Sequence, residues 1–264
     1  MPLLASIHGT KLYEFFEKNY RELGPVWSIS LPFIGRMVQG DSPELVEHVL
    51  KHNFLAYEKG PILKGVLFDL FGEGEYRHLG RDTTAQALSW MFYLLNRDGT
   101  DPSIKQTLVQ EVDDVLEGEL PSVNEALRIF PVVPRNLKLC VQDDVLPDGT
   151  KIYAGEWFTW SPYVMGRSEK IWGPDVLEYK PSRWLQGEKF SQGKFNSFHA
   201  GPRVCLGMNF AMLEALTLIG LILQKFDLTL VDSAKLPPYG VSVTFPMLEG
   251  LPMKVTRRRA AVGL

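Results

Sequence analysis

The residue with the clearest chemical potential in this chain of 264 residues is Cys205, which stands directly before the apolar stretch LGMNFAMLEALTLIGLIL. A helix over that stretch would turn the positive end of its dipole and its free N–H groups toward the sulfur, which favours a thiolate. Gly201 and Gly207 remove Cβ atoms on either side, so that a flat group can lie close to the backbone. Arg203 can reach an anionic edge of such a group. A thiolate facing a planar dianion is what haem ligation requires.

The segment FHAGPRVCLG, from Phe198 to Gly207, matches the pattern F-x-x-G-x-R-x-C-x-G at every fixed position. On these residues the chain resembles the cytochromes P-450, which bind haem iron through a cysteine thiolate. The resemblance implies that Cys205 is the iron ligand. It also implies that the other fixed residues, Phe198, Gly201, Arg203 and Gly207, bind the cofactor. The alternative is that Cys205 is a buried free cysteine.

Glu125 and Arg128 stand three residues apart in a predicted helix, so their side chains share a face and can pair. Arg183, in the segment PSRW, can add a forked set of hydrogen bonds to this pair. The resemblance implies a structural role for the three residues, because P-450 proteins combine E-x-x-R with an arginine in P-E-R-F/W. Ser182 replaces the glutamate of that segment. The alternative is a capping box from Ser122 to Glu125, in which Glu125 accepts only from a backbone N–H.

The segment GRDTT, residues 80–84, predicts a bend in a helix. Thr83 can bond back to the carbonyl of Leu79 and open the helix, and Asp82 beside it is a proton source. The resemblance implies that Asp82 and Thr83 are catalytic and deliver protons to dioxygen at the iron, while Gly80 lets the helix lie against the haem. Leu79 stands where the family has a small residue. Alternatively, Asp82 and Thr83 begin a helix as its N-cap and dipole partner.

Arg135 follows Arg128 by seven residues in the segment RIFPVVPR. The resemblance implies that Arg135 is a second arginine that binds a haem propionate. It also implies that Val132 and Val133 contact the substrate above the porphyrin. Otherwise Arg135 is a solvated strand residue and both valines belong to the core.

Composition excludes several classes of protein. With 45% apolar and 22% charged residues, the chain has the usage of a globular protein rather than of a disordered or fibrous one. A net charge of −3 gives no reason to expect a nucleic-acid partner. The chain has two cysteines, Cys140 and Cys205, and their distance in the sequence matches no C-x-x-C spacing, so neither a disulfide scaffold nor a structural zinc site is expected. Cys140 lies in a strand pattern and is expected in the core. Neither H-E-x-x-H nor G-x-S-x-G is present to support a zinc or serine hydrolase.

Hydrophobic periodicity predicts a mainly α, multihelical fold with small peripheral β-sheets, a contracted form of the P-450 fold. Helices with an apolar face are expected over residues 11–23, 44–52, 81–95, 103–116, 121–131 and 206–223. Strands are expected over residues 26–31, 36–40, 133–142, 151–160 and 226–231, with a last pair formed by 241–245 and 253–258.

The apolar segment from Leu206 to Leu223 is at the lower limit of length for crossing a bilayer, and it contains Asn209 and Glu214. A buried core helix is therefore the prediction for it. The opening residues, MPLLASIHGTKLYEFF, lack a basic region followed by an apolar run, so no signal peptide is expected.

The resemblance implies one incomplete P-450 domain over residues 1–264. Its N-terminal helix and sheet part lies in residues 1–74, and the central helix and haem-binding core lie in residues 80–264. The membrane anchor and the helices that precede the central helix are expected to be missing. One of those helices carries a W-x-x-x-R pair for a propionate, and no tryptophan lies between Trp27 and Trp90.

The resemblance implies a haem-thiolate monooxygenase that inserts one oxygen atom from O2 into a C–H bond. It would hold haem b through Cys205 and receive electrons from NADPH through a separate partner, NADPH-cytochrome reductase. Segments such as IWGPDVLEYKPSRWL are most similar to eukaryotic fatty-acid and alkane omega-hydroxylases, which implies a small lipophilic substrate. The family implies the endoplasmic reticulum membrane surface, with the cytoplasm as the alternative for a chain without an anchor. The competing function is a truncated, non-catalytic haem-binding remnant.

Overall fold

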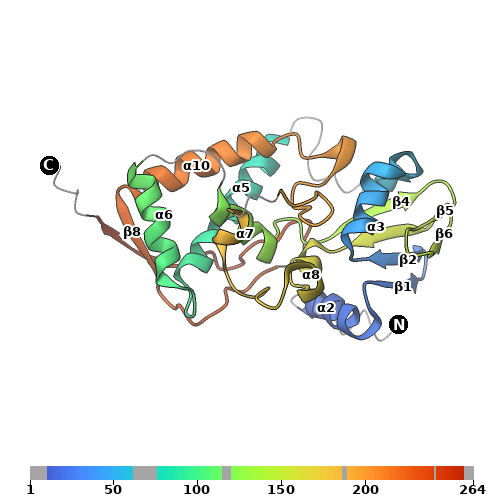
Figure 1. Cartoon of the computed structure of the whole chain (residues 1–264), viewed down its shortest axis with the longest axis horizontal. Coiled ribbons are helices and arrows are strands. Elements are labelled where there is room, and N and C mark those ends of the chain that lie inside the picture. Colours follow the sequence, from blue (N-terminus) through green and yellow to red (C-terminus); the bar gives the residue numbers. More distant parts are fainter. Residues whose placement is uncertain (1–10, 62–75, 115–119, 186–188, 241, 259–264) are drawn as a thin grey trace.

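The computed structural model of the chain describes residues 11–61, 76–114, 120–185, 189–240 and 242–258. A helical part and a sheet part lie next to each other along the long axis of the molecule (Figure 1). The longest helices and a small two-stranded sheet form the helical part, and the largest sheet forms the other end. This arrangement agrees with the predicted mainly helical fold with small sheets.

The described residues form α-helices, single turns of other helix types, and β-strands. The α-helices are α2 (Lys11–Leu23), α3 (Pro43–Glu47), α5 (Tyr76–Asn96), α6 (Pro102–Asp114), α7 (Pro121–Ile129), α8 (Pro162–Met165), α9 (Glu169–Trp172) and α10 (Met208–Leu223). The π-helix is η1 (His48–His52), and the 3-10 turns are η2 (Phe54–Ala56), η3 (Pro181–Trp184) and η4 (Gly201–Arg203). The strands are β1 (Val26–Leu31), β2 (Gly35–Gly40), β3 (Tyr57–Glu58), β4 (Asn136–Cys140), β5 (Asp144–Val145), β6 (Lys151–Ile152), β7 (Trp157–Trp160), β8 (Phe226–Leu230) and β9 (Met253–Arg257).

The largest sheet has five strands in the order β1-β2-β7-β4-β3. Strands β2 and β7 are parallel, and the other neighbouring pairs are antiparallel. The register places Lys138 opposite Phe158 and Tyr57 opposite Cys140. Because side chains alternate across a strand, Lys138 and Cys140 point to the same face of β4.

That face of the sheet is covered by α3 and η1, which form from the segment predicted as one helix. Ser42 caps α3 by accepting a hydrogen bond from the backbone N of Leu45 at 3.4 Å, and Pro43 occupies the first turn. Val46 and Val49 are buried in one apolar cluster with Phe158 and other residues of this face. Ala200, from the segment that carries the cysteine, is buried in the same cluster.

Two of the strand predictions were wrong, one because the segment forms two strands and one because the strand has a different partner. Residues 151–160 form two strands rather than one, because Gly155 has a positive φ of 90° in the turn that separates β6 from β7. Near the C-terminus, β9 pairs with β8 and not with residues 241–245, of which residue 241 lies outside the described residues.

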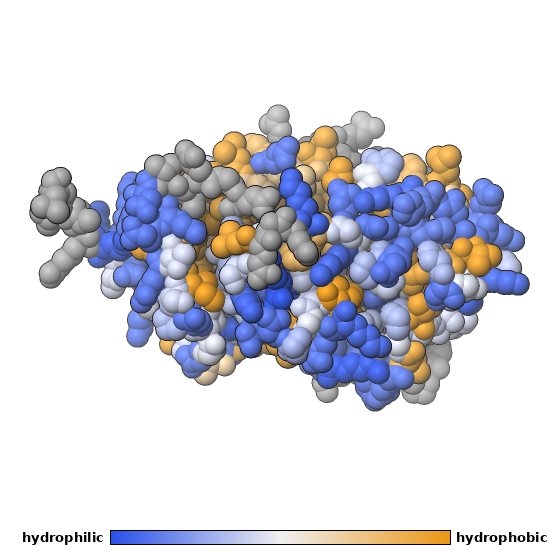
Figure 2. Space-filling view, in the orientation of Figure 1, coloured by the Kyte–Doolittle hydropathy of each residue, from blue (hydrophilic) through white to orange (hydrophobic). Residues whose placement is uncertain are grey.

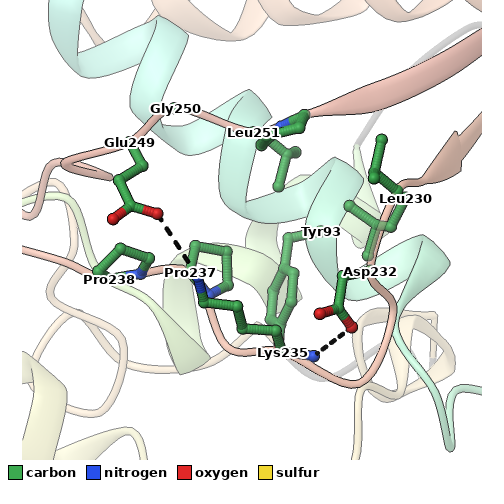
Figure 3. Close-up of a pocket in the computed structure, with 11 residues that line it drawn as sticks. Tyr93, Leu230, Asp232, Lys235, Pro237, Pro238, Glu249, Gly250 and Leu251 are labelled. Carbon is green, nitrogen blue, oxygen red and sulfur yellow. Dashed lines mark hydrogen bonds and ion pairs between the residues drawn. The ribbon is translucent and has the colours of Figure 1, made fainter.

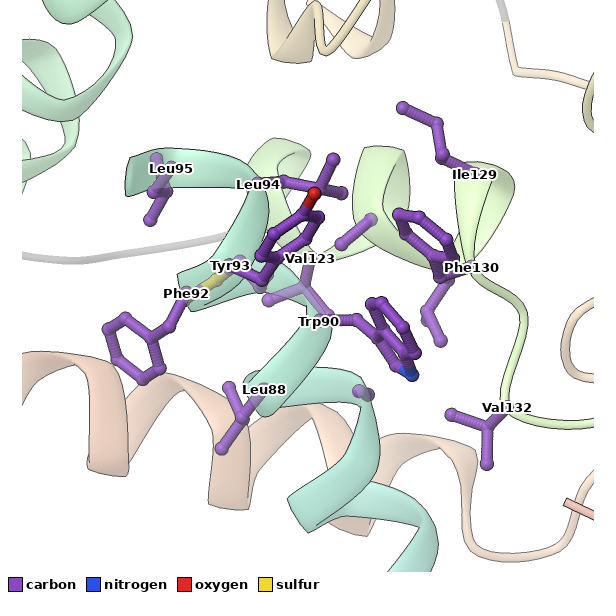
Figure 4. Close-up of a cluster of buried hydrophobic side chains, with 14 of the residues drawn as sticks. Leu88, Trp90, Phe92, Tyr93, Leu94, Leu95, Val123, Ile129, Phe130 and Val132 are labelled. Carbon is purple, nitrogen blue, oxygen red and sulfur yellow. The ribbon is translucent and has the colours of Figure 1, made fainter. Parts of the chain in front are cut away.

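The helical part is built around α5, which contacts α6, α7 and α10. Helix α5 begins at Tyr76, earlier than the predicted start at Arg81. Trp90 of α5 stacks on Phe130 after α7, with ring centroids 4.0 Å apart, inside a cluster of buried aromatic and aliphatic side chains (Figure 4). The indole of Trp90 donates to the carbonyl of Phe245 at 3.0 Å, so the polar atom of this large ring is satisfied. The core therefore holds α5 and α7 in fixed relative positions.

The apolar helix α10 forms as predicted, but it is not a fully buried core helix. Of its residues only Ala215, Ile219 and Leu223 are buried, because α5, α6 and β8 pack along one side. The side chains of Phe210 and Leu213 are 65% and 59% exposed. Figure 2 shows apolar surface along the upper edge of the molecule, where Figure 1 places α10. Among the helices that the structure describes, none combines the length and apolarity needed to cross a membrane.

Candidate functional site

Cys205 lies in a closed loop, residues 198–207, that leads from the sheet part into α10. The backbone N of Cys205 donates to the carbonyl of Phe198 at 2.8 Å, and the backbone N of Met208 donates to the carbonyl of Cys205 at 3.3 Å. The thiol of Cys205 is exposed and free, whereas Cys140 is fully buried in the core, as predicted. The interpretation of Cys205 as a buried structural cysteine is therefore wrong.

The glycines of the predicted site have different surroundings. At Gly201, which has a φ of 63°, a Cβ would lie 2.1 Å from the carbonyl oxygen of Leu50 in η1. Gly201 is thus required for close packing against protein backbone, which differs from the expected role of leaving room for a flat group. At Gly207 and Gly80 a Cβ would meet no atom within 4 Å. These two glycines face open space.

Arg203 fastens the cysteine loop to the neighbouring strand. Its Nη1 donates to the carbonyl of Tyr57 at 3.3 Å, and its guanidinium lies 4.6 Å from the ring centroid of Phe54. A guanidinium has five N–H donors, and among the described residues Arg203 has this one hydrogen bond. Donors remain for a carboxylate.

Arg135 lies on the side of the sheet that faces α2. Its guanidinium is 4.0 Å from the ring centroid of Phe16, and its Nη2 donates to Thr159 Oγ1 at 3.5 Å. Its Nε is buried and has no hydrogen-bond partner in the part of the chain that the structure describes. The interpretation of Arg135 as a solvated strand residue is therefore wrong.

A buried acid, which the sequence did not indicate, lies beyond Arg135 in the same polar network. Thr159 donates to the side-chain oxygen of Gln39, whose Nε2 donates to Asp41 Oδ1 at 2.8 Å. The backbone N of Ser161 donates to the same oxygen at 2.6 Å. Burial raises the pKa of Asp41 to about 7, against the opposing effects of Ser161, Gln39 and the charge of Arg135.

Asp41 should make the folded chain less stable as the pH rises from about 4 to about 7. In this range the unfolded chain has released the proton while the folded chain still holds it, so the slope reaches about 1.4 kcal/mol per pH unit. Asp41→Asn cannot ionise and should lose this dependence. Urea unfolding of both proteins across this range measures the difference, and parallel profiles would contradict the assignment.

The side chains of Glu125 and Arg128 form a fully buried ion pair on α7. Arg128 donates from Nη2 to Glu125 Oε1 at 2.8 Å and from Nε to Oε2 at 2.9 Å. Its Nη1 also donates to the carbonyls of Gly166 and Val176. Helix α7 begins after Leu120, without a side-chain cap. The capping-box interpretation of Glu125 is therefore wrong.

The η3 turn, which contains PSRW, completes the polar cluster around Glu125. Arg183 Nε lies 3.5 Å from Glu125 Oε1, and Arg183 Nη2 lies 3.0 Å from Asp175 Oδ1. Trp184 donates from Nε1 to Glu125 Oε2 at 2.9 Å. Trp184 was not predicted from the sequence, although an indole N–H directly after the predicted arginine is a usable signal. The structure thus brings all three predicted residues together.

Asp82 and Thr83 lie inside α5 rather than at its start, so the N-cap interpretation is wrong. Thr83 Oγ1 donates to the carbonyl of Gly80 at 3.0 Å, not to that of Leu79 as predicted. Its neighbour Thr84 donates to the same carbonyl at 3.0 Å. Asp82 is exposed and pairs with Arg81 at 3.1 Å. Asp82 is exposed and Thr83 is half-buried, and among the described residues neither side chain forms a hydrogen bond or ion pair with the cysteine loop.

The two valines predicted to contact substrate differ in burial. Val132 is buried in the cluster that contains Trp90 and Phe130 (Figure 4). This placement corresponds to the alternative in which Val132 belongs to the core. Val133 is half-buried.

Two clefts lie near these elements. One has a volume of about 710 Å³ and adjoins the cysteine loop, with Phe198, Val204 and Met208 among its lining residues. The other, of about 170 Å³, is formed by the segments around β8 and by Tyr93 of α5 (Figure 3). In it Lys235 Nζ lies 3.5 Å from Glu249 Oε2. The first cleft is the one next to the predicted site.

The residues of the loop fit a haem group. The free, exposed thiol of Cys205 would bind the iron as a thiolate, and the space at Gly207 is open. Arg203, two residues before the thiol, has unused donors. The described residues contain no group of three His, Cys, Asp or Glu side chains that could hold a metal ion by themselves. A single thiolate ligand with cationic neighbours is therefore the arrangement that these residues offer.

Comparisons with known proteins agree with this chemistry. The family model for cytochrome P450 matches residues 63–249. Cytochrome P450 monooxygenase cyp1 of Mycosarcoma maydis is 38% identical over 212 residues, covering 68% of this chain and 33% of the relative. Cytochrome P450 94A2 of Vicia sativa is 35% identical, covering 69% and 39%, and alkane hydroxylase MAH1 of Arabidopsis thaliana is 30% identical, covering 79% and 42%. The chain thus spans between a third and about two fifths of the length of these relatives.

Proposed function

The chain belongs to the cytochrome P450 family, and from this premise we propose that it is the haem-binding part of a monooxygenase that hydroxylates a fatty acid or an alkane. Bound haem would supply dioxygen activation and insertion of one oxygen atom into a C–H bond. The observation that carries the proposal is the exposed, free thiol of Cys205 in a loop that matches every fixed position of the family pattern.

Cys205 is proposed as the iron ligand, and Arg203 and Arg135 as partners of the propionates. Arg203 supports this role because it stands two residues from the thiol and keeps unused donors. For Arg135 the role rests on the resemblance alone, because its guanidinium lies against Phe16, on the face of the sheet opposite the one on which Ala200 of the cysteine loop packs. The carbonyl of Phe198 accepts the hydrogen bond from the Cys205 amide, which holds the backbone of the cysteine loop in place.

Asp82 and Thr83 are proposed to hold and move a proton along α5. The Thr83 hydroxyl donates to the Gly80 carbonyl, so its oxygen lone pairs can accept a proton from another donor. The exposed carboxylate of Asp82 can exchange protons with water. Gly80, with open space at its Cβ position, is proposed to let this helix approach the cofactor.

The proposed substrate class rests on the similarity of the chain to its relatives. One relative bears the name alkane hydroxylase, and the segment IWGPDVLEYKPSRWL is similar to the omega-hydroxylases. Val133 is proposed as a substrate contact, and buried Val132 as the residue that supports it. NADPH-cytochrome reductase as electron donor and the endoplasmic reticulum membrane surface as location are proposed on family grounds alone.

The ligand assignment is tested by exchanging each cysteine in turn. Reduced protein loaded with haem and treated with carbon monoxide should show the strongly red-shifted Soret band of thiolate ligation. Cys205→Ser should lose this band completely. Cys140→Ala, which changes the other cysteine of the chain, should keep it.

Two outcomes of this experiment would contradict the proposal, one for the iron ligand and one for the catalytic function. A thiolate band that persists in Cys205→Ser would show that another group binds the iron. A thiolate band in the wild type without fatty-acid hydroxylation, when NADPH and a reductase are supplied, would favour the non-catalytic haem-binding remnant.

A further inference from the structure

The side-chain carboxylate of Asp144 joins two elements that lie far from it in the sequence. Its Oδ2 accepts a hydrogen bond from the hydroxyl of Tyr57 at 2.7 Å and lies 2.7 Å from Nε2 of His48. Its Oδ1 accepts from the backbone N of Val145 at 2.9 Å. Asp144 begins β5, whereas Tyr57 begins β3 and His48 begins η1. One carboxylate, whose side chain is only 10% exposed, thus connects three elements.

The carboxylate of Asp144 is held in its ionised form. Burial by itself would raise the pKa of Asp144, but hydrogen bonds from Tyr57, His48 and Asn53 outweigh burial and keep the pKa below its ordinary value. An ionised carboxylate accepts hydrogen bonds and donates none, so Nε2 of His48 carries the proton of this contact. Both contacts to Oδ2 therefore belong to the stronger, charge-assisted class of hydrogen bonds.

The two elements that Asp144 connects also hold the cysteine loop. The π-helix η1 contacts η4, and its Leu50 carbonyl occupies the space that a Cβ at Gly201 would need. The carbonyl of Tyr57 in β3 accepts a hydrogen bond from Arg203 at 3.3 Å. Gly201 and Arg203 are the two ends of η4. The turn that precedes the cysteine is therefore fixed at both ends by elements that bind the same carboxylate.

The helix before η1 holds the chain that leads into the cysteine loop. The backbone N of Gly193 donates to Glu47 Oε1 at 3.1 Å, and a Cβ at Gly193 would lie 2.3 Å from the carbonyl oxygen of Pro43. Residues 43–52 thus contact the incoming chain closely at both Gly193 and Gly201. A displacement of this segment would move the loop with it.

The contact between His48 and Asp144 fixes the position of η1 in a way that its apolar contacts do not. Val49 and Leu50 are buried with Phe158, which holds η1 against the sheet. Apolar burial has no preferred direction, whereas a hydrogen bond weakens steeply when its geometry changes. The polar contact therefore determines where along the sheet η1, and with it the Leu50 carbonyl, comes to rest.

We propose that Asp144 is a positioning residue for the thiol of Cys205, which it places by acting through His48 in η1 and Tyr57 in β3. In the described part of the chain, Asp144 itself forms no hydrogen bond with the cysteine loop. The consequence for the iron ligand rests on the proposed function, whereas the effect on the loop does not.

The first test measures amide hydrogen exchange in the haem-free chain. Asp144→Asn keeps the shape of the side chain but removes its charge and one acceptor oxygen. Exchange in residues 198–207 should become about tenfold to a hundredfold faster, because hydrogen bonds to a charged group are lost. Exchange in β8 and β9, in the helical part, should not change. Asp143→Asn is the matched control, because Asp143 is exposed and accepts from the backbone N of Ala154 at 2.8 Å. It should exchange as the wild type.

The second test uses the carbon monoxide spectrum of reduced protein at equal haem content. Asp144→Asn should divide its Soret absorption between the red-shifted thiolate band and an unshifted band, because the thiol is no longer held in one place. His48→Leu, which removes the donor, should show the same division. His48→Gln keeps an N–H donor for the carboxylate and should restore the thiolate band of the wild type.

The outcomes separate this proposal from the proposed function. Exchange that rises equally throughout Asp144→Asn, or that stays at the wild-type rate in residues 198–207, would show that Asp144 does not position the loop. A His48→Gln protein as impaired as His48→Leu would overturn the route through η1. A wild type that binds haem without a thiolate band, while Asp144→Asn still loosens residues 198–207 alone, would contradict the haem-ligand proposal and support the positioning of the loop.

Discussion

Replacing Arg128 by alanine should leave almost no folded, soluble protein. The substitution strands the fully buried carboxylate of Glu125 and removes the donor to the carbonyls of Gly166 and Val176. Breaking a buried ion pair from one side costs about 3–5 kcal/mol. A domain has a total stability of about 5–15 kcal/mol, so a chain near the lower end of this range would lose most of its stability. Soluble yield and the urea midpoint of the haem-free chain measure the effect.

Lys180 provides the control for this prediction. Its backbone N donates to Glu125 Oε1 at 3.1 Å, but its side chain is exposed, so Lys180→Ala should keep the yield and midpoint of the wild type. Arg183→Ala should fall between the two, because Arg183 is partly exposed and meets Glu125 at 3.5 Å. A folded Arg128→Ala protein that merely turned over more slowly would show that Arg128 acts in chemistry and not in structure.

Gly201→Ala should displace the cysteine loop and abolish the thiolate spectrum. The new Cβ would lie 2.1 Å from the Leu50 carbonyl oxygen, and the residue would have to keep a φ of 63°. The left-handed conformation alone costs about 1–2 kcal/mol for an L-residue with a side chain. The overlap with backbone adds to this, because η1 cannot move without disturbing the apolar cluster around Leu50.

Gly207→Ala is the matched comparison, because its Cβ would meet nothing within 4 Å. The free energy of unfolding of the haem-free protein should stay within about 0.5 kcal/mol of the wild-type value. Unfolding curves of both haem-free variants measure this contrast, and carbon monoxide difference spectra measure the loss of the thiolate band in Gly201→Ala. A Gly201→Ala protein with the thiolate band of the wild type would contradict the role assigned to this contact.

Local patterns in the sequence predicted the parts of the structure that depend on neighbours along the chain. The amphipathic segments that became α2 and α7 have apolar residues at helical spacing, and the pairing of Glu125 with Arg128 needs only one turn of helix. The place of Cys205, shortly before the apolar helix α10, also follows from local sequence.

The features that the sequence did not indicate depend on contacts between distant segments. Arg135 lies beside Phe16 and Thr159 only because β4 pairs with β7 and α2 packs on that face of the sheet. The face of the sheet on which Lys138 lies likewise follows only from the register between β4 and β7. The exposure of α10 depends on which segments cover it, and its composition alone predicts burial on every side.

The π-helix η1 makes the cysteine loop sensitive to the length of a segment far away in sequence. In η1 the backbone N of Asn53 donates to the carbonyl of His48 at 2.8 Å, a spacing of five residues in place of the usual four. One residue fewer would rotate the following backbone by about 100° and take the Leu50 carbonyl away from Gly201. Substitutions on the solvent side of η1 leave this hydrogen-bond register intact. Deletion or insertion of one residue there would move the Leu50 carbonyl out of its contact with Gly201. The contact therefore depends more on the number of residues in η1 than on the identity of their side chains.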